Sequence, residues 1–152
     1  MKVVLANDHR GYRLKTILKK FLKDKNIESL DLGAFSTDSV DYPDFAFPAA
    51  KKVSDGEYER AVLICGSGIG MCIVANKLPR VRAALCHNIQ SAKMSREHND
   101  SNVLCLGASL ISEKLAQEIL EIWLETEFQG GRHLRRVEKI QIIESQLKMS
   151  CD

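Results

Sequence analysis

The sequence predicts an α/β fold: a single doubly wound (Rossmann-like) five-stranded parallel sheet with helices on both faces and an extra C-terminal helix. Short apolar runs alternate with segments of helical hydrophobic periodicity. Each strand–helix repeat takes about 20–30 residues, which is typical of doubly wound sheets. The 152 residues fit one domain with a sizeable core. We therefore expect a single domain over residues 1–152, with 132–150 as a C-terminal helical extension.

The composition narrows the class of protein. Hydrophobic residues make up 45% and charged residues 28%, which is ordinary for a soluble domain, and a net charge of +2 is too small to indicate a nucleic-acid partner. No apolar stretch approaches the roughly 18–20 residues of a membrane helix. Residues 1–6 do not resemble a signal peptide, because this strand-like run meets Asn7-Asp8 at once. We expect a cytoplasmic protein without a membrane partner.

The cysteines indicate reduced thiols. Their number is odd and none shows C-x-x-C spacing, so we expect neither a disulfide framework nor a zinc site. They stand at Cys65, Cys72, Cys86, Cys105 and Cys151.

The first part of the chain predicts two strands and two helices. Residues 2–6 form an apolar run that is typical of a buried parallel strand. An amphipathic helix follows, with apolar positions spaced as on one helical face: Leu14, Ile17, Leu18, Phe21 and Leu22. Residues 27–32 predict a second strand. Residues 33–44 predict a loop that is long enough to form one edge of a binding site. Residues 45–53 predict a helix that tolerates Pro48 near its start.

The fold is organised around the centre of the chain, residues 60–77. The apolar run 61–64 predicts a buried strand, and 71–77 predicts the first turns of a helix. Between them a tight turn lets the backbone approach a ligand closely, owing to Gly66, Gly68 and Gly70. Such a loop can bind an anion through unpaired N–H groups, and it would favour the thiolate form of Cys65 at its mouth. A tight turn with a buried, inert cysteine would give the same local pattern.

Two familiar phosphate-binding loops do not fit this segment. The dinucleotide pattern G-x-G-x-x-G requires glycine where Met71 stands, and no lysine follows Gly70 as a P-loop requires.

The last part of the chain predicts two further strand–helix units and an additional helix. Residues 81–86 and 102–106 predict strands, and 89–98 predicts a short polar helix. Ser112 can cap the next helix, which Gly130-Gly131 ends. A last amphipathic helix has its apolar positions at Val137, Ile140, Ile143 and Leu147. We expect its apolar face to pack on a partner subunit.

The predicted topology places polar residues at one edge of the sheet. Ligands of doubly wound sheets bind beyond the carboxyl ends of the strands, at the switch point, which lies between strands 1 and 3 for the common order 2-1-3-4-5. Those two ends carry Asp8-His9 and Cys65 with its glycine loop. An acid, an imidazole, a thiol and an anion-binding loop therefore converge, which favours a functional site.

These residues make the chain similar to the type-B ribose-5-phosphate isomerases, in the ribose and galactose phosphate isomerase family. The resemblance covers essentially the whole chain through spaced motifs in a fixed order. The motifs are Asp8-His9, Asp41-Tyr42-Pro43, Cys65-Gly-Ser-Gly-Ile-Gly70 with Ala75-Asn76-Lys77, the run from Arg96 to Leu104, and Gly130-Gly131-Arg132-His133 with Arg136.

The resemblance implies an enzyme that interconverts ribose 5-phosphate and ribulose 5-phosphate in the pentose phosphate pathway, with no metal or other cofactor. It implies that Cys65 is the base that moves a proton between C2 and C1, and that His98 opens the furanose ring. It implies substrate-binding roles for Asp8, His9, Gly66, Ser67, Gly68, Ile69, Gly70 and Asn99, and phosphate-binding roles for Arg132 and Arg136. The implied partners are a small sugar phosphate and a second copy of the chain, as a homodimer or a dimer of dimers.

One residue departs from the resemblance. Family members often have arginine after the Leu-Gly-Ala stretch, and Ser109 stands there, which removes a phosphate contact. The roles of His87 and His133 stay open. For the cysteines other than Cys65 we expect structural or rim roles.

Two alternative functions remain. A hexose 6-phosphate, such as allose or galactose 6-phosphate, would use the same mechanism in a longer pocket. A non-catalytic phosphate-binding or receiver-like module belongs to another class, but a receiver needs a phosphorylatable aspartate where Cys65 stands.

We also expect an active site shared between two subunits. Cys65 follows its strand and so lies at the carboxyl edge, whereas His98 precedes the fifth strand and so lies at the amino edge. A strand of about five residues spans roughly 17 Å, which is too far for both to act on one sugar. We expect Arg132 near the amino edge as well. A two-fold dimer that brings one subunit's carboxyl edge to the other's amino edge resolves the conflict.

Overall fold

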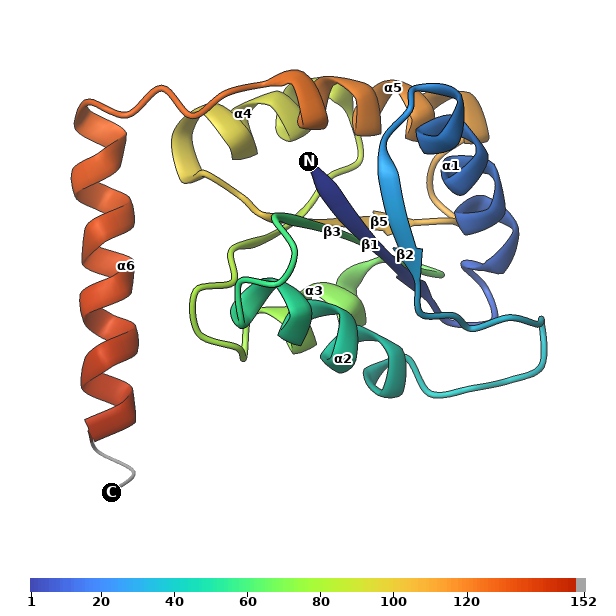
Figure 1. Ribbon diagram of the computed structural model, residues 1–152, viewed down its shortest axis with the longest axis horizontal. Helices are drawn as coiled ribbons and strands as arrows, with labels where there is room; N and C mark the ends of the chain where they lie inside the picture. The colour runs from blue at the N-terminus through green and yellow to red at the C-terminus, as the bar shows by residue number, and fades with distance from the viewer. Residues whose placement is uncertain (150–152) are drawn as a thin grey trace.

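The computed structural model describes residues 1–149 and contains one parallel five-stranded sheet with helices on both faces (Figure 1). The fold class predicted from the sequence is confirmed. Cys151 lies outside the described residues. The strands are β1 (Lys2–Asn7), β2 (Glu28–Asp31), β3 (Arg60–Cys65), β4 (Ala83–Leu85) and β5 (Val103–Gly107).

The strand order is β2-β1-β3-β5-β4, so the expected order 2-1-3-4-5 is wrong in its last two positions. β5 pairs with β3 on one side and with β4 on the other. All five residues of β5 are buried, whereas the three residues of β4 are partly exposed. The longer, fully buried strand occupies the interior and the three-residue strand the edge. The switch point between β1 and β3 is unaffected.

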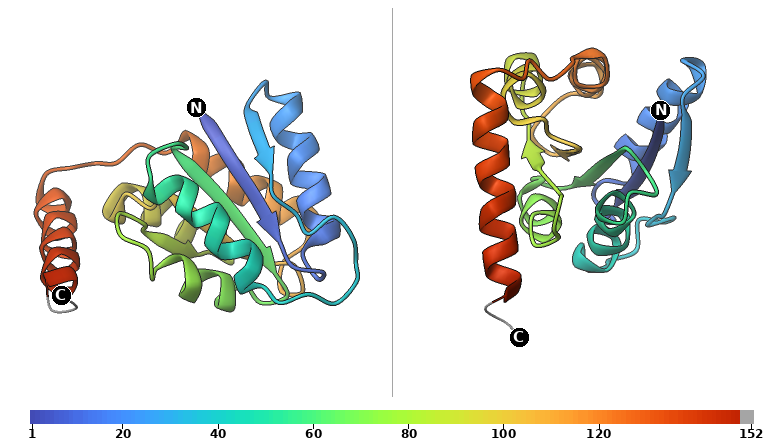
Figure 2. Two further views of the ribbon diagram at one scale, coloured as in Figure 1. Left: turned by 60° about the horizontal axis from the view of Figure 1, so that its bottom comes forward. Right: turned by 60° about the vertical axis from the view of Figure 1, so that its left-hand side comes forward.

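Two helical layers cover the sheet (Figures 1 and 2). One face packs against α1 (Tyr12–Asp24), α4 (Ile89–Asn99) and α5 (Glu113–Glu125), and the other against α2 (Pro43–Ser54) and α3 (Ile69–Ala75). α2 begins two residues before the predicted helix, with Pro43 in its first turn and Pro48 inside it. None of the helices in residues 1–149 is both long and apolar enough to cross a membrane.

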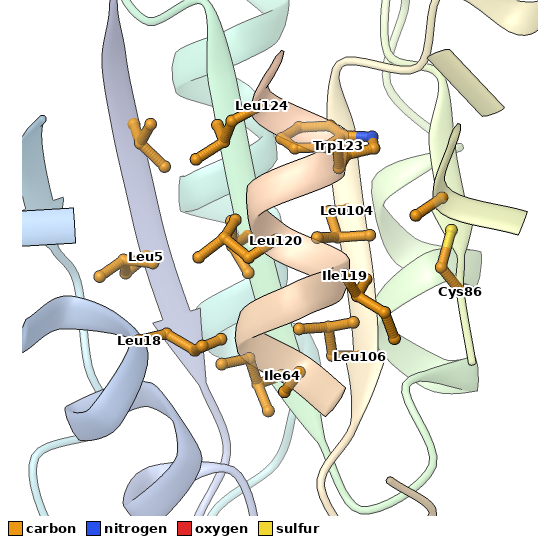
Figure 3. Packing of buried hydrophobic residues seen from close by; sticks show 14 of the residues in the cluster. Leu5, Leu18, Ile64, Cys86, Leu104, Leu106, Ile119, Leu120, Trp123 and Leu124 are labelled. Atoms are coloured by element: carbon orange, nitrogen blue, oxygen red, sulfur yellow. The ribbon is translucent and has the colours of Figure 1, made fainter. Parts of the chain in front are cut away.

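The larger core cluster is centred on α5 (Figure 3). Ile119, Leu120 and Trp123 are fully buried there against the central strands. The indole N–H of Trp123 donates to the Ser101 hydroxyl at 2.8 Å, so its polar group is satisfied in the interior. Ser112 caps α5 as predicted, since its hydroxyl accepts from the Leu115 N–H group.

The last helix, α6 (Arg132–Met149), stands beside the domain rather than on either face of the sheet (Figures 1 and 2). His133 and Val137 are buried near its start. Farther along, Ile140, Ile142 and Ile143 are 40–55% exposed. An isolated chain therefore leaves much of the apolar surface of α6 uncovered.

Candidate active site

Cys65 ends β3 at the carboxyl edge of the sheet, directly before the glycine loop, residues 66–70. Its side chain is 5% exposed. The Gly68 N–H group donates to the Cys65 sulfur at 3.1 Å. The sulfur therefore lies against the backbone of the loop, with one N–H group directed at it.

The glycine loop has a conformation that other residues would disturb. Gly68 has a φ of +77°, and an added Cβ would lie 3.0 Å from the Leu106 carbonyl oxygen. At Gly70 an added Cβ would lie 2.6 Å from the ring of Tyr42, so the loop after β2 closes over this end. Gly68 caps α3, which begins at Ile69, two residues before the predicted start. Glycine thus allows both the turn and the close approach of neighbouring chain segments.

Asp8 lies beside the end of β3. Its N–H group donates to the Ile64 carbonyl at 3.1 Å, one residue before Cys65. Its carboxylate oxygen Oδ1 accepts from the N–H groups of Arg10 and Gly11 at 2.9 and 3.0 Å. The structure therefore brings Asp8 and Cys65 together, as the switch-point argument predicts, and it fixes the orientation of the carboxylate.

Two residues flank Asp8, and one of them connects it to the loop after β2. His9 accepts at Nδ1 from the Val40 N–H group, at 3.3 Å. Asn7, which no motif in the sequence includes, is fully buried, and its side-chain amide donates to the Asp8 carbonyl at 2.7 Å. Its Oδ1 atom is buried without a hydrogen-bond partner among residues 1–149. The sequence gives no signal for this position, because asparagine is a common residue in the turns that follow strands.

The other predicted site residues lie at the opposite edge. The rings of His98 and His133 stack with centroids 4.3 Å apart and planes 10° apart. His133 is 6% exposed. Burial, together with the neighbouring His98, Arg132 and Arg136, lowers the pKa of His133 below its ordinary value. Asn99 follows His98 at the end of α4, and its side chain is exposed.

Hydrogen bonds place this second group at the amino edge. The Ala61 N–H group donates to the Asn102 carbonyl at 3.0 Å, and Arg60 Nη1 donates to the Ser101 carbonyl at 3.1 Å. The segment after His98 therefore adjoins the start of β3, while Cys65 ends the same strand. The length of β3, roughly 17–20 Å, separates the two groups within one chain.

The remaining described cysteines differ in acidity. Interaction with the Cys105 thiol lowers the pKa of Cys72 to about 7, although burial opposes this. Burial raises the pKa of Cys86 and of Cys105. All four described cysteines are free thiols. In the described part of the chain, no cluster of three or more His, Cys, Asp and Glu side chains could hold a metal ion.

Comparisons with known proteins find similar chains over nearly the whole length of this one. The Bacillus subtilis protein YwlF is 51% identical over 141 residues, covering 92% of this chain and 95% of its own length. The structure of Clostridium thermocellum ribose-5-phosphate isomerase B matches with a TM-score of 0.95 at 48% identity, over 97% of this chain and 99% of that one. Mycoplasma genitalium ribose-5-phosphate isomerase B, with bound ribulose-5-phosphate, matches with a TM-score of 0.91 at 39% identity, over 95% and 96% of the two chains.

The family comparison covers most of the molecule, including both edges of the sheet. The model of the Ribose/Galactose Isomerase family matches residues 3–140, which contain Asp8, Cys65, His98 and Arg132. Together with the relatives above, this match shows that the chain belongs to the ribose/galactose isomerase family.

Proposed function

We propose that the chain interconverts ribose 5-phosphate and ribulose 5-phosphate through an enediolate, as a step of the pentose phosphate pathway. The observation that carries the proposal is the placement of Cys65 at the carboxyl edge, against the Gly68 N–H group and beside Asp8. Two related structures support the substrate, because both proteins are named ribose-5-phosphate isomerases and one holds ribulose-5-phosphate. The proposed reaction uses no metal or other cofactor.

The mechanism begins with a proton transfer at Cys65. The thiolate removes the proton from C2 of the open-chain aldose, a proton passes from the C2 hydroxyl oxygen to the C1 oxygen, and the resulting thiol returns its own proton at C1 to give the ketose. The intermediate enediolate carries negative charge on oxygen, which preorganised donors stabilise. N–H groups of the glycine loop, residues 66–70, and the Ser67 hydroxyl are donors at this position.

The other residues bind and prepare the substrate. In the proposed site Asp8 and His9 hold sugar hydroxyls. His98 transfers the proton that opens the furanose ring, and Asn99 binds the sugar beside it. Arg132 and Arg136 lie four apart on α6, so both can face one phosphate.

The functional unit in this proposal is a homodimer. Cys65 and His98 lie at opposite edges of the sheet in one chain, so a complete site needs His98 from a second copy. The exposed apolar residues of α6, including Ile142 and Ile143, support an additional subunit contact. Assembly of two such dimers stays a prediction.

We also propose that the chain works in the cytoplasm. The four free thiols among the described residues suit a reducing compartment. Fractionation of the source cells should recover the chain with cytosolic markers, and recovery with secreted proteins would contradict the proposal.

Hydrogen exchange in deuterated water tests the proposed function. Wild-type protein should convert ribose 5-phosphate to ribulose 5-phosphate and incorporate deuterium at the transferred position. Cys65→Ala should reduce turnover by about 10²–10⁴, while substrate binding stays within a few-fold. Cys72→Ala, the matched control, should retain turnover. Hexose 6-phosphates assayed in parallel test the alternative substrate, and absence of both exchange and turnover with every sugar would reject the enzymatic proposal.

A further inference from the structure

Arg10 lies over the glycine loop, at a position that none of the sequence motifs includes. A Cβ built on Gly66 would lie 2.9 Å from Arg10 Cδ and 3.5 Å from Arg10 Nη1. The same point is 3.7 Å from the Ser109 hydroxyl oxygen. The absence of a side chain at Gly66 therefore leaves room for Arg10 beside Ser109, directly after the proposed catalytic cysteine.

The guanidinium group of Arg10 has no carboxylate partner among residues 1–149. Arg10 is exposed, and its one hydrogen bond there is from its backbone N–H group to Asp8. Arg13, in the first turn of α1, instead forms an ion pair with Glu113 at 2.7 Å. Arg10 thus presents an unpaired cation at the edge of the sheet where the substrate would bind.

The backbone holds this arrangement from two sides. The Ser109 N–H group donates to the Gly66 carbonyl at 3.0 Å, so the segment after β5 is attached to the glycine loop. The Arg10 N–H group donates to Asp8, which is attached to the end of β3. Arg10, Gly66 and Ser109 are therefore kept close by the same hydrogen bonds that shape the candidate site.

We propose that Arg10 binds the phosphate group of the substrate, from the subunit that supplies Cys65. This inference rests on the proposed function, because it takes a sugar phosphate as the ligand. A guanidinium group can donate two parallel hydrogen bonds to a phosphate, which a nearby hydroxyl such as that of Ser109 cannot replace. Arg10 also approaches Ser109 from the segment between β1 and α1, so it supplies a cation where position 109 does not.

The test measures phosphate binding separately from turnover. Inorganic phosphate is titrated calorimetrically into the intact wild-type protein, Arg10→Met and the matched control Arg13→Met. Arg10→Met should weaken phosphate binding about tenfold or more and raise KM for ribose 5-phosphate similarly, with kcat within about twofold, because a charge-assisted contact is lost. Arg13→Met should bind phosphate like the wild type. Unchanged phosphate binding and KM in Arg10→Met would overturn the inference.

A second variant tests whether positions 10 and 109 serve one phosphate. Ser109→Arg in the Arg10→Met background should restore most of the lost phosphate affinity. If the affinity is not restored, the inference that residues 10 and 109 face the same phosphate is wrong. Circular dichroism and thermal melting verify that each variant folds.

If wild-type protein bound phosphate through Arg10 but isomerised no sugar, the proposed function would fail and the role of Arg10 as a phosphate ligand would stand. If Arg10→Met isomerised ribose 5-phosphate with normal turnover and KM, the proposed function would stand and the role of Arg10 would fail.

Discussion

Cys65 and Cys72 are seven positions apart and differ in what surrounds the sulfur atom. Cys65 faces the Gly68 N–H group at the sheet edge. Cys72 lies on α3, where its sulfur is 3.5 Å from both the Asn76 side-chain amide and the Ala83 carbonyl. The pKa of Cys72, lowered to about 7, favours its thiolate form. A lowered thiol pKa alone therefore does not identify the proposed catalytic cysteine.

Alkylation separates the two thiols. Iodoacetamide should modify Cys72 with a rate that rises with pH around a midpoint of about 7, because the thiolate fraction rises through that pKa. Cys86 and Cys105 should react more slowly, since their pKa values are raised. Peptide mass spectrometry follows each site.

The same reagent should inactivate the enzyme only through Cys65. Cys72→Ala should still lose activity on alkylation, and ribose 5-phosphate should slow that loss. Inactivation that disappears in Cys72→Ala would contradict the role of Cys65.

The sequence marks some of these residues and not others. Cys65 and Asp8 follow apolar strands at the switch point, so topology alone places them together. The acidity of Cys72 depends on Cys105, which belongs to another strand, and the position of Arg10 depends on its approach to Gly66. Contacts of that kind between distant segments leave no pattern in the sequence.

At the scale of elements, a buried ion pair ties α1 to β2. Lys15 Nζ lies 2.8 Å from the Asp31 carboxylate, and the two side chains are 3% and 9% exposed. Lys19 also contacts Asp31 at 2.9 Å. Burial alone would raise the pKa of Asp31, but hydrogen bonds from Lys15, Lys19 and the Gly33 backbone lower it below its ordinary value. The pair therefore holds the edge strand in place while the carboxylate is charged.

Asp31→Asn should destabilise the protein by about 3 kcal/mol at neutral pH, because the buried Lys15 ammonium loses its countercharge. A folded-state pKa below the unfolded value means that Asp31 contributes stability above pH of about 4, which is lost as pH falls through the folded pKa. Urea unfolding at several pH values measures both effects. Lys20→Met, which affects an exposed pair with Asp24, is the control and should change stability by less than about 1 kcal/mol. An Asp31→Asn variant as stable as the wild type at neutral pH would contradict this account.

The elements themselves were largely predictable. Apolar runs mark all five strands, helical periodicity marks α1 and α6, and Ser112 marks the start of α5. The order of β4 and β5 was not predictable by the same argument, because both runs are short and apolar. Only pairing with β3, a contact distant in sequence, decides which of them lies inside.

At the scale of the whole molecule, the two halves of the proposed site lie at opposite edges of the sheet. The strand-by-strand argument predicts this separation, and the hydrogen bonds around Ala61 and Asn102 place the segment after His98 at the amino edge. The arrangement of two chains in a dimer cannot be predicted from sequence patterns, because the contact between copies depends on the shape of both surfaces. α6 shows only that apolar surface is available for such a contact.

The most direct test mixes two inactive variants, each retaining one half of the site. Unfolded Cys65→Ala and His98→Ala chains are combined in equal amounts, refolded together and assayed with ribose 5-phosphate. Random pairing makes about half of the dimers mixed, and each mixed dimer has one site with both lesions and one with neither. Roughly a quarter of wild-type activity should therefore return. Activity no higher than that of the separately refolded variants would contradict a site shared between two subunits.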